Sequence, residues 1–561
     1  MIKKHELRIS HQYLNFPVKD GATMRKVRFR VGDQVVRFFD IEWAEGELDF
    51  WVFTDVLEFK GERLVIEIDG AEKKPPMDED SSSTDESENL TAFTHSDTIE
   101  GGENLYKEKH RPQFHFTSRR GWINDPNGLV YYKGTYHLFY QHNPYGRKWG
   151  NMHWGYATSK NLVQWEEFSD VLYPDELGTM YSGCAFVDWD NIAGLKNGLN
   201  DTLICFYTAA GEYIEPKVPF TQCMAYSVDG GQSWRKYDDN PILPHIAAST
   251  RDPCVIWDPG SEQWIMALYV AYDKGRGQDP QHFALFRSTN LKDWNRLQDL
   301  YFPGWGECPD FFPIPLDGDD NKTNWVFWKA DGQYLVGTFD GTSFTPETEI
   351  LKSTYGPDTA FRCGYAAQTW SDIPQEDGRI IQIAWLINEI PDMPFNQQMT
   401  FPVELTLKST ENGPRLHSWP VKEIALLYQE EKHLNNILIS DRITILPTDD
   451  HVLLDIQAMI DVGDADEIEF NFRGIPLIYD VNKQEVSCLE KTTRLKTKDG
   501  SIQFRVLLDQ ASIEIFVENG LVYLPFGVIP EDHNTTCFLQ AKGGTGLAKN
   551  INITKLKSSW E

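Results

Sequence analysis

SKNLVQW, at residues 159–165, is the clearest of four related stretches that decide the fold of this chain; the others are SVDGGQSW at 227–234, STNLKDW at 288–294 and the weaker FDGTSF at 339–344. Each has Ser or Phe, then residues that favour a turn, then an aromatic. Their spacing of about 50 to 70 residues suits the four-stranded blades of a β-propeller with insertions. We expect each turn between the third and fourth strands of a blade, with its aromatic packed between blades.

Aligning the chain on these turns locates the first strand of each blade. Five such strands are expected, at GWINDPNGLVYY (121–132), MYSGCAFVDW (180–189), TRDPCVIWD (250–258), GECPDFFPIP (306–315) and GYAAQTWSD (364–372). The sequence therefore predicts a five-bladed β-propeller over residues 108–408.

The flanking sequence is also β-rich. Residues 1–72 and 420–561 contain short runs with period-two alternation, which indicates strands. We predict a small N-terminal β domain and a C-terminal β-sandwich, so that the whole chain is all-β. Residues 73–107 are rich in Pro, Ser and acids and poor in apolar residues, which predicts an acidic flexible linker.

Composition excludes several classes of function. The chain has 53 basic and 84 acidic residues, a net charge of −31, which repels phosphate backbones and disfavours nucleic-acid binding. No run of about 18 apolar residues is present, so no membrane span is expected. The eight Cys are scattered without a C-x-x-C pair, which favours buried thiols over a metal site. The start, MIKKHELRIS, lacks an apolar segment, and we expect a cytoplasmic protein.

The first strand of each blade lines the axis of a propeller, so equivalent positions of distant repeats converge. Three of these positions carry acids: Asp125, Asp252 and Glu307. Ser182 in the second repeat, and Tyr365 and Gln368 in the fifth, face the same axis in this alignment. Gathering like charges is costly because each raises the pKa of the others, yet glycoside hydrolysis uses such a carboxylate set.

Simpler interpretations exist for single residues. Asp125 lies in NDPNG, which by itself is typical of a turn, and only the register with the other two acids favours catalysis. Cys308 has no accompanying base motif, so we expect a packed neighbour of Glu307. His142 and His153 lack metal-ligand spacing and are expected to be polar lining or packed residues. The chemistry needs no metal and no cofactor.

WINDPNG (122–128), RDP (251–253) and EC (307–308), in this order, resemble the signature of glycoside hydrolase family 32, which includes invertases, exo-inulinases, levanases and fructosyltransferases. The resemblance continues to DQASIEIF (509–516) and spans about residues 108–561. It implies that Asp125 is the nucleophile, Glu307 the general acid/base and Asp252 the transition-state stabiliser. It also implies a set of residues that hold the fructosyl unit: Asn124, Gln141, Trp149, Ser182 and Arg251.

The resemblance implies a retaining glycosidase that releases terminal fructose from sucrose, fructo-oligosaccharides, inulin or levan, with a small carbohydrate as its partner. A fructosyltransferase of the same family and a non-catalytic carbohydrate-binding relative are the alternatives. Two departures bear on substrate choice: Cys363 stands where relatives usually carry an acid, and Glu389 stands where an aromatic often lies. The sequence leaves the oligomeric state open.

Overall fold

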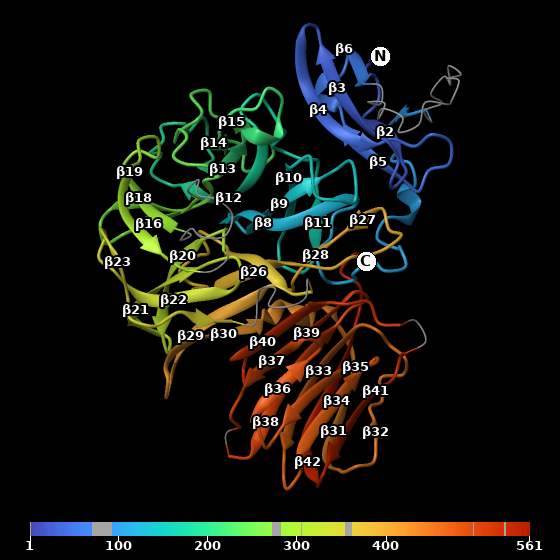
Figure 1. Cartoon of the computed structure of the whole chain (residues 1–561), viewed down its shortest axis with the longest axis vertical. Helices are drawn as coiled ribbons and strands as arrows, with labels where there is room; N and C mark the ends of the chain where they lie inside the picture. The colour runs from blue at the N-terminus through green and yellow to red at the C-terminus, as the bar shows by residue number, and fades with distance from the viewer. Residues whose placement is uncertain are drawn as a thin grey trace, which may run out of the picture.

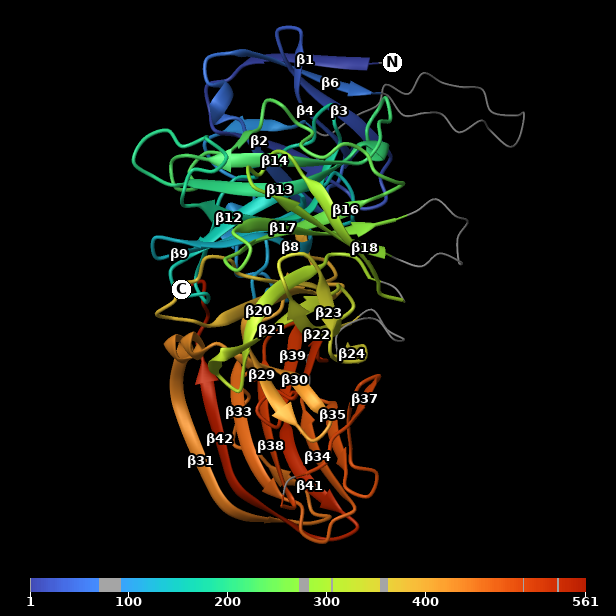
Figure 2. The ribbon, with the colours of Figure 1, turned by 90° about the vertical axis from the view of Figure 1, so that its left-hand side faces the viewer.

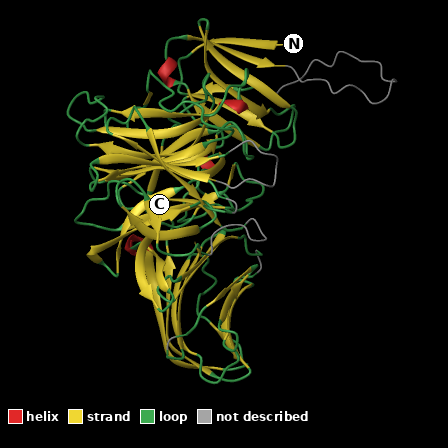
Figure 3. Cartoon of the chain, turned by 60° about the vertical axis from the view of Figure 1, so that its left-hand side comes forward, coloured by secondary structure: helices red, strands yellow, loops and turns green. Residues whose placement is uncertain are grey.

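The computed structural model describes residues 2–69, 92–271, 282–303, 306–353, 362–497, 499–531 and 534–561. Figure 1 shows three β-rich regions in chain order: an N-terminal region, a central propeller and a C-terminal sandwich. Figure 3 shows that strands dominate, as predicted for an all-β chain. None of the described helices is long and apolar enough to cross a membrane.

Two sheets form the N-terminal region, with strand orders β1-β6-β3-β4 and β5-β2-β7. They share a buried core that includes Phe16, Phe29 and Trp43. The elements are β1 (Ile2–Arg8), β2 (Tyr13–Val18), β3 (Met24–Val31), β4 (Gln34–Glu42), β5 (Phe50–Asp55), η1 (Leu57–Phe59), β6 (Arg63–Asp69), β7 (Thr94–Ser96) and η2 (Gly102–Asn104).

The predicted linker 73–107 is wrong at its C-terminal end. Residues 94–96 form β7, which pairs with β2, and the side chain of the fully buried Asn15 donates to Thr98 O at 3.2 Å. This segment is ordered because it completes a sheet and satisfies a buried amide. Residues 73–91 of the predicted linker lie outside the described residues.

The propeller strands group into successive antiparallel sets, and each predicted first strand is the first strand of one set. Within the described residues the sets begin at β8, β12, β16, β20 and β25, and the last two sets join through one parallel bridge between β20 and β29. The number of blades stays a prediction. The first three sets contain β8 (Gly121–Tyr132), β9 (Thr135–Asn143), β10 (His153–Ser159), β11 (Trp165–Glu167), β12 (Thr179–Asp188), β13 (Thr202–Ala210), η3 (Gly211–Tyr213), β14 (Thr221–Ser227), β15 (Arg235–Lys236), β16 (Arg251–Asp258), β17 (Gln263–Val270), β18 (His282–Ser288) and β19 (Asn295–Tyr301).

The last propeller sheet extends beyond the predicted boundary at 408, because β29 and β30 pair with each other and β29 pairs with β26. The sheet therefore ends at Pro420 rather than within the predicted propeller limits. Its elements are β20 (Asp310–Leu316), β21 (Asp319–Trp328), β22 (Gln333–Phe339), β23 (Phe344–Pro346), β24 (Leu351–Lys352), β25 (Gly364–Thr369), β26 (Ile380–Leu386), β28 (Gln398–Met399), β29 (Val403–Thr410) and β30 (Gly413–Pro420), while β27 (Phe395–Asn396) pairs with β8.

The repeated turns have the predicted location and share one hydrogen-bond pattern. In each, an Asn or Asp side chain after the third strand accepts two backbone N–H groups of the turn, at 2.8 to 3.1 Å. The four capping residues are Asn161, Asp229, Asn290 and Asp340. The aromatic that ends each turn packs into an apolar core: Trp165 and Phe344 are buried in one, and Trp234 and Trp294 pack against one.

The C-terminal region is a sandwich of two six-stranded sheets with a continuous apolar core. Figure 2 shows it at the end of the molecule opposite the N-terminal region, with the propeller between them. After η4 (Lys422–Leu427) its strands are β31 (Tyr428–Ile439), β32 (Thr444–Ile445), β33 (Leu454–Asp461), β34 (Glu467–Phe472), β35 (Ile475–Asp480), β36 (Glu485–Cys488), β37 (Lys491–Arg494), β38 (Ser501–Leu508), β39 (Ser512–Val517), β40 (Val522–Gly527), β41 (Cys537–Lys542) and β42 (Gly546–Leu556).

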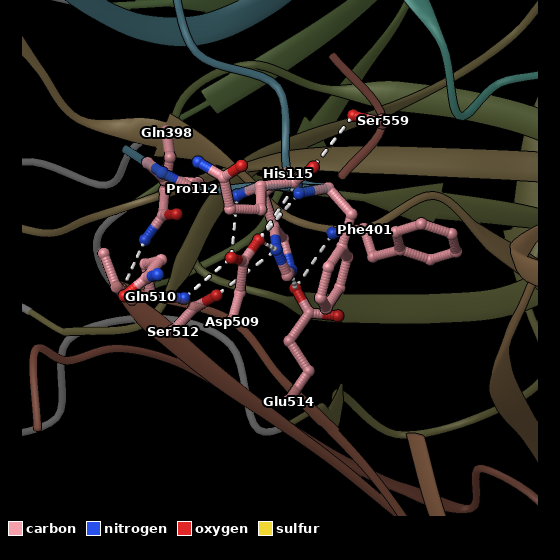
Figure 4. A network of polar contacts seen from close by, with 12 residues as sticks. Pro112, His115, Gln398, Phe401, Asp509, Gln510, Ser512, Glu514 and Ser559 are labelled. Carbon is pink, nitrogen blue, oxygen red and sulfur yellow. Dashed lines mark hydrogen bonds and ion pairs between the residues drawn. The ribbon is translucent and has the colours of Figure 1, made fainter. Parts of the chain in front are cut away.

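A buried polar network joins the sandwich to the start of the propeller (Figure 4). Asp509 accepts the backbone N–H groups of residues 113–115 and pairs with His115 Nδ1 at 2.8 Å. Glu514 lies 3.2 Å from His115 Nε2 and accepts the N–H of Phe401. All three charged side chains are fully buried, so the two regions are held by a specific set of bonds as well as by apolar packing.

Candidate active site

Asp125 and Asp252 come from different propeller sets and meet at Cys308. The thiol of Cys308 lies 3.3 Å from Asp125 Oδ2 and 3.5 Å from Asp252 Oδ2, and its backbone N–H donates to the same Asp252 oxygen at 3.2 Å. Ser182 Oγ donates to Asp125 Oδ2 at 2.5 Å. The first strands of three sets and the segment before β20 therefore converge on one cluster of oxygens.

Glu307 completes this cluster through Arg251. The guanidinium donates from Nε to Glu307 Oε2 at 2.9 Å and lies 3.6 Å from Asp252 Oδ2. The hydroxyl of Tyr365 donates to Glu307 Oε1 at 3.2 Å. One cation thus lies between two of the three carboxylates, and the predicted convergence of the acids is present in the structure.

A β-bulge directs the side chains in each of four first strands. The register with the neighbouring strand shifts between Ile123 and Pro126, Tyr181 and Gly183, Arg251 and Cys254, and Tyr365 and Gln368. The residues between these register positions include Asp125, Ser182, Asp252 and Ala366. A bulge adds a residue and re-aims the side chain beside it, which is how extended strands present polar groups at the axis.

Backbone strain is concentrated at the same place. Asp252, Cys308 and Ala366 have φ of 63°, 46° and 50°, in the left-handed region that non-glycine residues seldom adopt. Asp252 is held there because its N–H donates to Thr208 Oγ1 at 2.9 Å and its carboxylate accepts from Cys308. Such strain is maintained where the surrounding structure fixes a functional side chain.

Burial acts in the same direction on the two aspartates. Burial, followed by the charge of Glu307, raises the pKa of Asp125, and the hydrogen bond from Ser182 opposes this rise. Burial also raises the pKa of Asp252, with Glu307 and Asp125 adding to it and Arg251 opposing it. Both carboxylates therefore carry a free-energy cost when ionised, as expected of acids gathered for chemistry.

The predicted substrate-binding residues divide into two groups. Asn124, Ser182 and Arg251 contact the acids directly, with Asn124 Nδ2 donating to Asp125 Oδ1 at 3.2 Å. Gln141 is buried nearby on β9 and donates to Met180 O at 2.9 Å. Trp149 is different, because it lies at the rim with 46% of its surface exposed, and its ring contacts those of Tyr181 and Tyr213.

Other residues singled out in the sequence have structural positions. His142 pairs with Asp170 and with Arg120 O, and His153 is buried with its pKa lowered to about 3 by burial, so both are packed as predicted. Cys363 is buried, whereas Glu389 is exposed. Among the described residues, no group of three or more His, Cys, Asp or Glu is arranged to hold a metal ion.

Sequence reasoning missed Thr208 and the bridging role of Cys308. Thr208 lies in the second strand of its set, which the alignment of first strands did not consider. The EC dipeptide placed Cys308 beside Glu307, but only the strained backbone turns the thiol toward the other two acids.

Comparison with known proteins shows to which class and family of proteins this chain is similar. The model for the glycosyl hydrolases family 32 N-terminal domain matches residues 115–420. A levanase of Bacillus subtilis is 34% identical over 503 residues, covering 81% of this chain and 72% of that protein. An exo-inulinase of Aspergillus ficuum is 28% identical over 537 residues, covering 81% and 96%.

Solved structures of similar enzymes share the fold of this chain. The exo-inulinase from Aspergillus awamori has a TM-score of 0.70 at 26% identity, covering 81% of this chain and all of that one. A β-fructofuranosidase from Schwanniomyces occidentalis has a TM-score of 0.69 at 22% identity, which shows the fold alone. The protein is a glycoside hydrolase. Within that class, the chain belongs to glycoside hydrolase family 32, whose model begins after the N-terminal region described above.

Proposed function

We propose that this enzyme is a retaining β-fructosidase that releases terminal fructose from sucrose or fructan chains. The observation that carries the proposal is the cluster of Asp125, Asp252 and Glu307, drawn from three propeller sets and joined through Cys308 and Arg251. Relatives named levanase and exo-inulinase support a fructan substrate.

Each carboxylate has a distinct task in this mechanism. Asp125 attacks the anomeric carbon and forms a covalent fructosyl-enzyme, while Glu307 protonates the departing glycosidic oxygen. Glu307 is then ionised, and Arg251 stabilises this carboxylate by a charge-assisted hydrogen bond. In the second step Glu307 takes a proton from the water that releases fructose and regains its protonated form. Asp252 accepts hydrogen bonds from ring hydroxyls as positive charge develops on the sugar. Retention at the anomeric carbon follows, and proton NMR of the first product formed would show inversion if the two-step route is wrong.

Replacing the proposed nucleophile tests the assignment. Asp125→Asn keeps the shape of the side chain but removes its charge, so fructose release from sucrose, inulin and levan is expected to fall by at least about 10³-fold. Asp310→Asn is the matched control, because Asp310 is also a buried first-strand Asp but bonds Thr369 N at 2.8 Å instead of the cluster. Equal activity of Asp125→Asn and the wild type would refute the proposal.

A further inference from the structure

A groove of about 1650 Å³ lies between the N-terminal region and the first two propeller sets. It exceeds the roughly 300–1,000 Å³ of ordinary small-molecule sites. One wall is the outer face of β3 and β4. Most of the opposite wall comes from residues within 149–152, 168–176, 212–217 and 230–236.

Strand alternation explains why charged and aromatic side chains of the N-terminal region face the groove. Val27, Phe29, Phe39 and Ile41 point into the core of the N-terminal region. Their neighbours along the strands necessarily face the other way. Lys26 pairs with Asp40 and Arg28 with Phe38 across the two strands, so charged, polar and aromatic groups stand side by side in the groove: Lys26, Arg28, Phe38 and Asp40.

The propeller wall offers further aromatic surface among polar groups. Trp149, Phe168 and Tyr213 are 46%, 40% and 54% exposed, and all three line the groove. Exposed rings beside hydrogen-bonding groups are the combination that stacks on sugar rings while meeting their hydroxyls.

The two walls are fixed relative to each other by polar and stacking contacts. Glu42 pairs with Lys148 at 2.8 Å, and Asn151 exchanges two hydrogen bonds with the backbone of Asp40, at 2.7 and 2.8 Å. The ring of Phe39 stacks on Tyr145 at 3.5 Å. These contacts hold both ends of the loop that carries Trp149, so the N-terminal region forms part of the rim.

Three aromatic rings connect the groove with the catalytic cluster. Tyr213 lies 5.4 Å from Trp149 and 5.5 Å from Tyr181, measured between ring centroids. Tyr181 directly precedes Ser182, whose hydroxyl donates to Asp125. A chain whose terminal unit lies at the acids therefore passes Tyr181 and reaches Trp149 and Tyr213 in the groove.

We propose that this groove binds the sugar units that follow the terminal fructosyl unit of a fructan chain, with the β3–β4 face of the N-terminal region as one wall. The inference rests on the proposed function and deepens it, because it makes chains of many fructosyl units, rather than sucrose, the preferred substrates. The N-terminal region is then part of the substrate site and not a separate module.

Phe38→Ala tests the groove, because Phe38 belongs to the N-terminal wall and makes no contact with the catalytic cluster. The readout is the kcat/KM for inulin and for levan, each divided by the kcat/KM for sucrose, which cancels any loss of folded enzyme. We expect the ratio for at least one polymer to fall about fivefold, mainly through KM, since one stacking ring is lost. The control is Met24→Ala, which removes a 52% exposed side chain of the neighbouring strand β3, outside the groove, and its ratios are expected to equal those of the wild type.

A binding measurement complements the kinetics. Calorimetric titration of inulin and levan into Asp125→Asn and into Asp125→Asn/Phe38→Ala is expected to show about fivefold weaker binding in the second protein. Unchanged ratios and unchanged affinities for both polymers would overturn the groove assignment while fructose release by the wild type still upheld the proposed function. A wild-type enzyme that released no fructose from any of the three substrates would instead overturn the proposed function.

Discussion

The hydroxyl of Ser182 affects the pKa of Asp125, the proposed nucleophile. Its short hydrogen bond to Asp125 favours the ionised carboxylate, whereas burial and Glu307 favour the protonated form. The resulting pKa is raised above that of an ordinary Asp. The nucleophile must be ionised to attack, so the acidic limb of kcat/KM against pH reports this balance.

Ser182→Ala is expected to move that acidic limb to higher pH, because the pKa of Asp125 rises further when a donor to its charged form is lost. The kcat/KM at the optimum is expected to fall about tenfold or more, as for a lost hydrogen bond to a charged group. The pH profile of kcat/KM on sucrose measures both effects. Ser159→Ala, which removes a hydroxyl from a remote turn, serves as the control. An acidic limb unchanged from wild type would contradict this account of Ser182.

At the residue scale, the sequence predicted the acids and missed part of what holds them. Asp125, Asp252 and Glu307 follow from the register of the repeats, since turns fix where each first strand begins. The ion pair between Arg251 and Glu307 does not follow, because the resemblance implied only that Arg251 holds the fructosyl unit. Side-chain direction at a bulge depends on the strained backbone of Asp252 and Cys308, which no local pattern encodes.

At the element scale, the repeated turns are the part of the fold that the sequence predicts most directly. An Asn or Asp that accepts two backbone N–H groups requires only a local arrangement, so the motif is visible without knowledge of the rest of the chain. The boundary at Pro420 was missed because β29 and β30 have the same alternation as the sandwich strands that follow. Only long-range pairing with β26 assigns them to the propeller.

Asn290→Ala removes one of these caps and is expected to lower the free energy of unfolding by about 1 kcal/mol. Its side chain accepts from Lys292 N at 3.0 Å and Asp293 N at 2.8 Å. Thermal unfolding measures the loss, and kcat/KM is expected to stay at the wild-type value because the hydrogen bonds of Asn290 lie within its own turn and involve none of the three acids. Asn290→Asp keeps the acceptor that Asp229 and Asp340 provide in other repeats, and a melting temperature as low as that of the Ala variant would contradict the capping role.

At the scale of the whole molecule, the network of His115, Asp509 and Glu514 explains how two segments far apart in the sequence are held together. DQASIEIF contributes Asp509 and Glu514, and the residues just before the first blade contribute His115 (Figure 4). Burial lowers the pKa of His115, but its hydrogen bonds and ion pairs with Asp509 and Glu514 raise it to about 9 overall.

This shift gives a pH dependence of stability with a defined sign. The folded pKa of about 9 exceeds the unfolded value near 6.5, so the contribution of His115 is fully present below pH 6.5 and is lost as the pH rises through 9. The melting temperature is expected to fall between pH 6.5 and 9 in the wild type. In His115→Gln it is expected to fall less over the same range. Parallel curves for the two proteins would show that the junction does not depend on this charge.

Removing one partner of the network is a harsher change. Asp509→Asn leaves the His115 cation without its nearest counter-charge, and the free energy of unfolding is expected to drop by about 3 kcal/mol. Urea unfolding followed by tryptophan fluorescence measures this drop. Asp461→Asn, which alters a half-exposed Asp at the end of β33, is the control. A loss no greater than that of the control would contradict the proposed role of the junction.

The central claim is that carboxylates from separate propeller sets act on one glycosidic bond. The crystal structure of Asp125→Asn with a bound fructo-oligosaccharide tests it most directly. The claim predicts the anomeric carbon of the terminal fructosyl unit at about 3–3.5 Å from residue 125, with Glu307 at the glycosidic oxygen and Asp252 at the ring hydroxyls. A terminal unit bound elsewhere, or one that contacts only one of the three side chains, would contradict it.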